Sequence, residues 1–271
     1  MTERRAVPHP WAASLFDDVR RVITIPLSEV DFVIRSEAET VVAGVAWEPH
    51  VHEVHELLWS TRGALSVRVG ARVWALPAGS GVWIPAGTEH HANAAAGTGY
   101  RAVYVSPRAS PDLPDAPLGI TVSPLLREIL SYLDGDDAPA EARDWAERLG
   151  VHLLTRCARD AAPGAGLRVP QDARIRAIAA GIVANPGDRT PLAQWARDAG
   201  LSERTIARAF VESTGLSFTQ WRSAVRVHCS MALLAEGMNV AEVAELMGYE
   251  TSSAFIAAFR RATGSTPGSL R

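Results

Sequence analysis

Four side chains that commonly bind transition metals lie close together in the sequence, at His50, His52, Glu56 and His90. Alternate residues of a β-strand share a face, so His50 and His52 point the same way, as does Glu56 if the strand stays regular. His90 follows a Pro-Ala-Gly turn and is expected on a facing strand. Three imidazoles and one carboxylate suit Zn²⁺, Fe²⁺, Mn²⁺ or Ni²⁺, with open positions for water or a ligand. We therefore expect one divalent transition metal per chain.

The alternative is that these residues belong to a β-barrel that no longer binds a metal, because single histidines in strands are usually structural or exposed. Five of the eight histidines fall between residues 50 and 91, which favours a metal site. By strand parity His55 and His91 point away from the proposed ligands, so we expect them behind the site or on the surface.

Short strands must position these residues. Runs rich in β-branched and aromatic residues, separated by Pro and Gly, are typical of strands in an all-β domain. They cover residues 22–25, 31–35, 40–47, 57–60, 65–69, 72–76, 81–85 and 100–105. Eight or so such strands fit a double-sheet jelly-roll barrel over residues 22–106. Residues 1–21 are expected to form a mobile arm.

Glycines flank the metal-binding residues at regular distances. Gly44 precedes His50 by six residues, and Gly63 follows Glu56 by seven. Gly79 precedes the first residue of the Pro-Ala-Gly turn by six residues, and His90 follows the last residue of that turn by three. Over residues 24–105 the pattern resembles both halves of the cupin signature, with Asn93 one residue closer to His90 than usual. The resemblance implies a jelly-roll barrel with a metal or effector site at the four residues.

Two amphipathic helices are predicted after the barrel, within residues 120–160. Ser123 is suited to cap the first, with Pro124 at its first helical position. The pair forms either a cover over one barrel sheet or a dimer interface. For the dimer, the expected contacts are Leu126, Leu130, Leu133, Trp145, Leu149 and Leu153. Residues 161–170 contain two prolines and two glycines, so they are expected to form a flexible linker.

Residues 171–271 carry a helix, a glycine turn and a second helix twice, at 190–213 and 239–261. Gly200 and Gly248 allow the steep crossing with which a second helix projects into a DNA major groove. Ser202 and Thr251 are suited to cap the second helices. The long helix between the units carries Arg222 and Arg226, which are candidates for phosphate contact or for pairing between the units.

From about residue 172 onward the sequence resembles the DNA-binding domain of AraC/XylS-type transcription regulators. The first unit matches at Ala196, Gly200, Leu201, Ser202, Phe210, Gly215, Phe218 and Arg226. The second matches at Val243, Ala244, Gly248, Tyr249, Ser253, Phe255, Phe259, Gly264 and Pro267. The resemblance implies two recognition helices on double-stranded DNA, in major grooves about one turn, or ~34 Å, apart.

The outward faces of the two recognition helices differ. Expected DNA-binding residues of the first are Ser202, Arg204, Thr205, Ala207 and Arg208. Those of the second are Thr251, Ser252, Ser253, Ile256, Ala257 and Arg260. Arginine can bind guanine through two hydrogen bonds, whereas serine discriminates little between bases. We therefore expect the first helix to read bases and the second mainly to hold the DNA backbone.

The charge is divided unevenly along the chain of 271 residues. Residues 170–271 hold 11 Arg and 9 acidic residues (+2), residues 1–169 hold 16 Arg and 21 acidic residues (−5), and the sum is −3. A basic excess this small predicts modest phosphate affinity, so DNA binding should depend on a homodimer or a second site. Two distant cysteines suggest no disulfide framework. No apolar run reaches membrane-spanning length and no signal-peptide core follows Met1, so we expect a cytoplasmic protein without membrane contact.

These features predict a two-domain protein: a cupin barrel with a helical hairpin, then an all-α domain with two helix-turn-helix units. The leading hypothesis is a sequence-specific transcription regulator, without catalytic residues, whose barrel senses a small molecule or a transition metal. One alternative is a cupin metalloenzyme of the dioxygenase or isomerase type fused to a DNA-binding domain. Another is a metal-free barrel used only for dimerisation.

Overall fold

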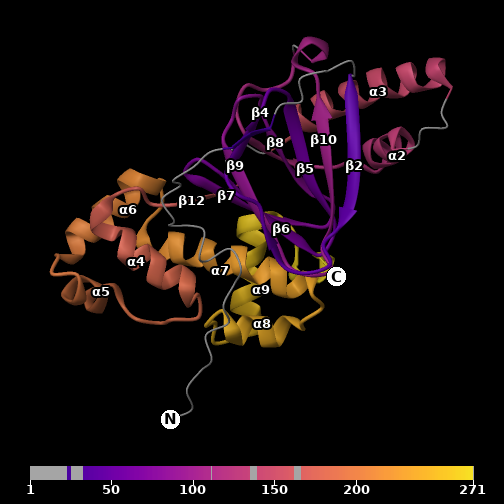
Figure 1. The fold of residues 1–271 in the computed structure, drawn as a ribbon. Coiled ribbons are helices and arrows are strands. Elements are labelled where there is room, and N and C mark those ends of the chain that lie inside the picture. The colour runs from indigo at the N-terminus through magenta and orange to yellow at the C-terminus, as the bar shows by residue number, and fades with distance from the viewer. Residues whose placement is uncertain (1–22, 26–32, 111, 135–138, 162–165, 271) are drawn as a thin grey trace. The chain divides into compact units, whose positions relative to one another are not determined.

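The computed structural model describes residues 23–25, 33–110, 112–134, 139–161 and 166–270 (Figure 1). The predicted arm, residues 1–21, lies outside the described residues. The chain divides into two compact units. The described parts of residues 19–70 and 76–166 form a β-rich unit with two helices, and residues 71–75 with 167–270 form a mainly helical unit. The predicted two-domain fold class is therefore confirmed.

Two sheets build the β-rich unit. One contains β1 (Ile23–Ile25), β4 (His50–His52), β9 (His90–Ala94) and β6 (Ala64–Val69) in that order, with β3 (Val45–Ala46) beside β9. The other has the order β11 (Leu118–Thr121), β8 (Ser80–Ile84), β5 (His55–Arg62), β10 (Gly99–Val105) and β2 (Ile34–Thr40). In β5 every residue from Glu56 to Ser60 is buried, because both faces of the second sheet are covered.

Two helices cover one face of the second sheet (Figure 1): α2 (Pro124–Leu133) and α3 (Ala140–Arg159). The Ser123 hydroxyl caps α2 by accepting a hydrogen bond from Leu126 N, as predicted. The apolar stripe of α2 packs in one core with Leu57, Trp59 and Trp83 of the sheet. On α3 the buried positions are Ala146, Gly150, Leu154 and Ala158.

The predicted dimer contacts on α2 are wrong. Leu126, Leu130 and Leu133 are at most 4% exposed, because they fill the core beneath α2, where a second chain cannot reach them. On α3, Trp145 and Leu149 are 66% and 40% exposed, and Leu153 packs partly against the same core. The hairpin thus covers the barrel, while only part of the predicted set stays accessible.

The helical unit begins earlier than expected, because part of the predicted linker is ordered. β12 (Leu167–Arg168) pairs with β7 (Arg72–Pro77), opposite Val73 and Arg72. Leu167 and Val169 are buried in the core of the helical unit. The linker predicted for residues 161–170 therefore ends before Leu167.

Six α-helices follow, and they share one core. They are α4 (Ala173–Ala184), α5 (Leu192–Asp198), α6 (Glu203–Thr214), α7 (Phe218–Ala235), α8 (Val240–Leu246) and α9 (Ser252–Thr263), before a short 3-10 helix, η2 (Pro267–Leu270). Phe210, Trp221, Phe255 and Phe259 are fully buried in this core. No helix in the described part of the chain is long and apolar enough to cross a membrane.

Candidate functional site

Three of the proposed metal ligands meet at neighbouring strands of one sheet. His50 on β4 is paired directly with His90 on β9, and His52 lies two residues along β4. The imidazole centroids are 4.3 Å apart for His50 and His90, and 4.9 Å apart for His50 and His52. One ring nitrogen from each histidine lies within 4.8 Å of the other two.

Glu56 completes the cluster from the opposite sheet. Its Oε2 lies 2.9 Å from His90 Nε2 and 3.3 Å from His52 Nε2. The expected places of Glu56 and His90 are therefore exchanged. Glu56 faces the histidines from β5 of the other sheet, and His90 lies beside His50 in the same sheet. The chain bends between β4 and β5, so Glu56 does not continue the strand of His50 and His52.

The donor atoms fit a divalent cation. His50 Nδ1 lies 2.7 Å from Glu48 O, and His90 Nδ1 lies 2.9 Å from Thr88 O. A carbonyl only accepts, so each Nδ1 carries the proton and each Nε2 keeps its lone pair when the ring is neutral. His52 Nδ1 is buried without a hydrogen-bond partner, and among the described residues the buried His52 Nε2, His90 Nε2 and Glu56 Oε2 have only their ion-pair contacts with one another. Such atoms are costly unless an ion satisfies them.

Distances support the same conclusion. Ligand atoms about 2.1 Å from one tetrahedral ion lie about 3.4 Å apart. The three histidine nitrogens already lie within 4.8 Å of one another, so small rotations of the rings can bring them to that spacing.

The electrostatics keep the carboxylate ionised. Burial raises the pKa of Glu56, but the nearby nitrogens of His52 and His90 outweigh burial and lower it to about 2. Burial lowers the pKa of His90, yet the Glu56 carboxylate outweighs that effect and raises it. For His50 burial dominates and lowers the pKa. An anionic ligand among imidazoles is the donor set that borderline metals prefer.

Tyr104 borders the cluster, although no motif in the sequence marks it. Its ring centroid is 5.4 Å from that of His52, and burial followed by the Glu56 charge raises the phenol pKa, which keeps the group neutral. Its position on β10 opposite Glu56 could be predicted only from the pairing of β10 with β5. His55 lies outside the cluster: its Nδ1 accepts a hydrogen bond from Ala86 N, and its ring stacks on Trp83. His91 is buried.

The two helix-turn-helix units have the predicted local geometry. Gly200 and Gly248 adopt φ values of 65° and 74°, where a side chain would be strained. Ser202 accepts a hydrogen bond from Thr205 N, and Thr251 accepts one from Ala254 N, so both predicted N-caps are present.

The expected DNA-binding residues lie away from the core. Ile206, Ala209 and Phe210 of α6 are buried, as are Phe255, Ala258 and Phe259 of α9. Exposed positions are Ser202, Arg204, Arg208, Thr251, Ser253, Ile256, Ala257 and Arg260, whereas Thr205, Ala207 and Ser252 are half-buried. Arg208 Nε lies 3.3 Å from Glu212 Oε1 in an exposed ion pair. Such a pair contributes only about 0.3–0.5 kcal/mol, so DNA can replace it.

The second helix-turn-helix unit touches the loop before the first one at a backbone contact that the sequence did not indicate. A Cβ on Gly187 would lie 2.3 Å from Leu246 O, and one on Gly248 would lie 2.4 Å from Gly187 O. Arg226 ties this contact to α7, because its Nε and Nη2 each donate to a carbonyl, those of Pro186 and Asp188, at 2.8 Å. Its guanidinium also lies over Tyr249, 5.4 Å from the ring centroid. We call the contacting residues the joint: Pro186, Gly187, Asp188, Arg226, Leu246, Gly248 and Tyr249. Arg226 thus links the loop before the first helix-turn-helix unit to Tyr249 of the second.

Comparisons with known proteins agree with both units. The family described as "AraC-like ligand binding domain" matches residues 42–179, and that described as "Helix-turn-helix domain" matches residues 195–271. The HTH-type transcriptional regulator NimR of Escherichia coli is 31% identical over 219 residues, covering 81% of this chain and 80% of NimR. The HTH-type transcriptional regulator RipA of Corynebacterium diphtheriae is 40% identical over 103 residues, which are 38% of this chain and 31% of RipA. The crystal structure of ToxT from Vibrio cholerae covers 88% of this chain and 97% of its own at 11% identity, with a TM-score of 0.36.

The fold and the matches define a transcription regulator with a barrel-type ligand-binding domain and a double helix-turn-helix domain. The chain belongs to the AraC family of HTH-type transcriptional regulators. Its similar curated proteins are named as transcriptional regulators and not as enzymes.

Proposed function

We propose that this regulator binds a divalent transition metal in its barrel and that the metal, alone or with a small molecule bound to it, controls sequence-specific DNA binding. The observation that carries the proposal is the convergence of three histidines on the buried Glu56 carboxylate. There His52 Nδ1 has no hydrogen-bond partner, and among the described residues His52 Nε2, His90 Nε2 and Glu56 Oε2 have only one another as polar contacts. His50, His52, Glu56 and His90 would hold the ion, and open coordination positions would accept a ligand.

Metal content tests the barrel. We expect about one transition metal per chain in full-length protein prepared without chelators, and loss of that metal in the His50→Ala, His52→Ala double variant. His152→Ala is the matched control, because that histidine is exposed on α3. Metal should also raise the melting temperature of the wild type, since a ligand at 100 times its Kd stabilises by about 2.7 kcal/mol. Protein that contains no metal and gains no stability from added Zn²⁺, Fe²⁺, Mn²⁺ or Ni²⁺ would refute this part.

We propose that α6 reads base edges and that α9 mainly holds the DNA backbone. Arg204 and Arg208 project from α6 as exposed guanidinium groups, whereas the outward residues of α9 are mostly small. Arg208→Ala should cost about 1–3 kcal/mol of affinity and relax base preference at one position of a mapped site. Ser253→Ala should weaken mapped and scrambled DNA alike. If Arg208→Ala changes neither affinity nor preference, α6 does not read the site as proposed.

We also propose a homodimer formed through the exposed face of α3. Trp145 and Leu149 stand one helical turn apart and are the exposed apolar residues of that helix. The modest charge of the helical unit favours two copies on DNA, because each contributes few phosphate contacts. Trp145→Glu should convert a dimer to a monomer in analytical ultracentrifugation, while Tyr132→Glu, also an exposed aromatic position, serves as the control on α2. A wild type that stays monomeric at micromolar concentration would refute the dimer.

A further inference from the structure

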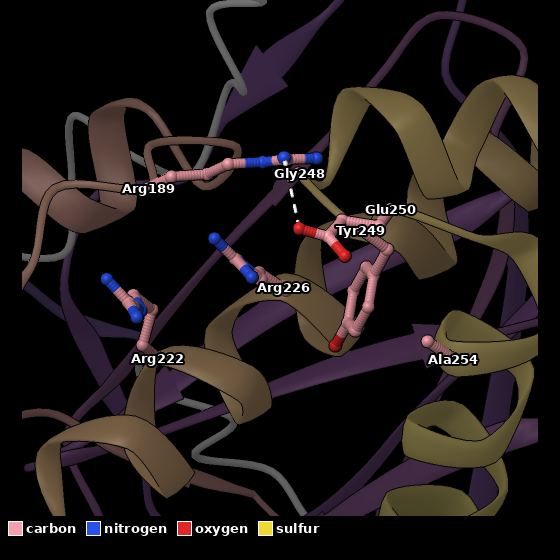
Figure 2. A pocket seen from close by; sticks show the side chains of 7 residues that line it. All are labelled: Arg189, Arg222, Arg226, Gly248, Tyr249, Glu250 and Ala254. Atoms are coloured by element: carbon pink, nitrogen blue, oxygen red, sulfur yellow. Dashed lines mark ion pairs between the residues drawn. The ribbon is translucent and has the colours of Figure 1, made fainter.

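A basic pocket lies beside the joint, next to α7, the helix that connects the two helix-turn-helix units. Its volume is about 330 Å³, and Figure 2 shows the side chains around it. They come from the loop before α5, from α7, from the turn that leads into α9 and from the first turn of α9: Arg189, Arg222, Arg226, Tyr249, Glu250 and Ala254. Three guanidinium groups face one carboxylate, so the formal charge of the pocket is +3 − 1 = +2. We call it the arginine pocket.

The three arginines have different tasks. Arg226 is held in the wall by its bonds to Pro186 O and Asp188 O. Arg222 donates from Nη1 to Thr190 O at 2.8 Å, and among the described residues no second acceptor binds its guanidinium. Arg189 is 51% exposed, and its Nη1 lies 3.8 Å from Glu250 Oε1, at the outer limit of an ion pair. Arg222 and Arg189 therefore keep donors for an incoming anion.

The positive charges are not neutralised within the pocket. Burial lowers the pKa of Arg226, and the nearby charges of Arg222 and Arg189 lower it further, which indicates mutual repulsion. An anion among these groups would relieve that repulsion, and a guanidinium can bind two phosphate oxygens at once.

The position of the pocket indicates which anion it binds. Two recognition helices in successive major grooves leave a minor groove between them, bordered by phosphates that face the protein between its units. The walls of the arginine pocket come from the residue just before the first unit, from α7 between the units and from the second unit, where Ala254 belongs to the first turn of α9. We propose that the arginine pocket binds a phosphodiester group of the DNA backbone between the two recognition helices, with Arg222 and Arg189 as the contacting residues. This inference rests on the proposed DNA binding.

The salt dependence of DNA binding by the full-length protein tests the pocket. Each neutralised phosphate contributes about −0.9 to the slope of log affinity against log salt concentration. Arg222→Gln should make the slope shallower by about 0.9 and weaken mapped and scrambled DNA equally, without changing base preference. Arg222→Lys keeps the charge and should recover most of the slope. Arg127→Gln removes the same charge from an exposed position of α2 and should leave the slope unchanged.

Glu250→Gln provides a test of opposite sign. It removes the pocket's carboxylate, so DNA binding should become tighter at low salt and the slope steeper. A merely structural role for Arg222 predicts no such effect.

The proposal is overturned if Arg222→Gln keeps the wild-type slope or if Glu250→Gln does not tighten binding at low salt. It is also overturned if calorimetry with inorganic phosphate shows a site that Arg222→Gln removes while the DNA slope is unchanged, since the pocket then binds a small anion. Failure of the proposed function looks different: the wild type would not prefer mapped over scrambled DNA, whatever the slope.

Discussion

At Gly248, one added methyl group should disrupt the contact between the second helix-turn-helix unit and the loop before the first. In the Gly248→Ala variant the new Cβ would lie 2.4 Å from Gly187 O. That atom belongs to the backbone, so no side chain can rotate away to make room. Gly248 also adopts φ 74°, a conformation that is unfavourable for alanine. The substitution therefore combines backbone strain with a steric overlap.

Matched glycines separate these two costs. Gly264 ends α9 with φ 76°, and a Cβ there meets nothing within 4 Å, so Gly264→Ala should cost only the strain of about 1–2 kcal/mol. Gly187→Ala produces the overlap, with Leu246 O at 2.3 Å, without a positive φ. Overpacking of this kind costs about 1–3 kcal/mol. Gly248→Ala should combine both and lose about 2–5 kcal/mol.

Native-state hydrogen exchange of the full-length protein measures these values locally. Peptides that cover α8 and the residues around Gly187 should report the lost free energy of opening in the Gly248→Ala and Gly187→Ala variants. In Gly264→Ala the same peptides should retain wild-type protection. If Gly248→Ala costs no more than Gly264→Ala, the close approach of the two backbones does not contribute to stability and the joint is wrongly described.

Three further predictions concern packing, pH and thiol chemistry. Leu126→Ala should destabilise the barrel by about 2–5 kcal/mol in denaturant unfolding, because the side chain is 1% exposed, whereas Trp145→Ala should cost the monomer little. Hydrogen bonds from an adjacent guanidinium lower the pKa of Asp172, the cap of α4, to about 2. Its stabilisation is therefore complete above about pH 4 and is lost as pH falls toward 2, so unfolding of Asp172→Asn should depend less on pH across that interval. Burial raises the pKa of the Cys229 thiol, so iodoacetamide should label half-buried Cys157 in the native protein and Cys229 only after unfolding, as mass spectrometry of digests can verify.

Local signals explain why the helical unit could be predicted more fully than the barrel. Ser202 and Thr251 of the helical unit are N-caps in both sequence and structure, as is Ser123 of the hairpin, because a cap depends only on residues within one helical turn. His90 was expected on a strand, but the strand pattern did not mark residues 90–94, because His-His-Ala-Asn-Ala has little apolar alternation although all five residues are buried. Its burial depends on partners far along the chain.

Nonlocal geometry also explains the errors at the metal cluster and the hairpin. The bend that moves Glu56 to the opposite sheet has no proline or glycine to mark it. The spacing of Leu126, Leu130 and Leu133 identifies a buried helix face, but the same spacing serves a sheet of the same chain or a second subunit. The joint was not predictable, since Gly187 and Gly248 are brought together only by the packing of α8 and the loop before α5.

The unlike outward faces of α6 and α9 have a consequence for promoter architecture. If α6 reads bases and α9 mainly holds the backbone, as proposed, the DNA element matched to one chain has no internal two-fold symmetry. It therefore has a head and a tail, and inverting the element reverses the order of the two contacts along the promoter. Genome searches limited to inverted repeats would overlook single-chain elements of this kind, and a reporter series should vary the orientation of the element as well as its sequence.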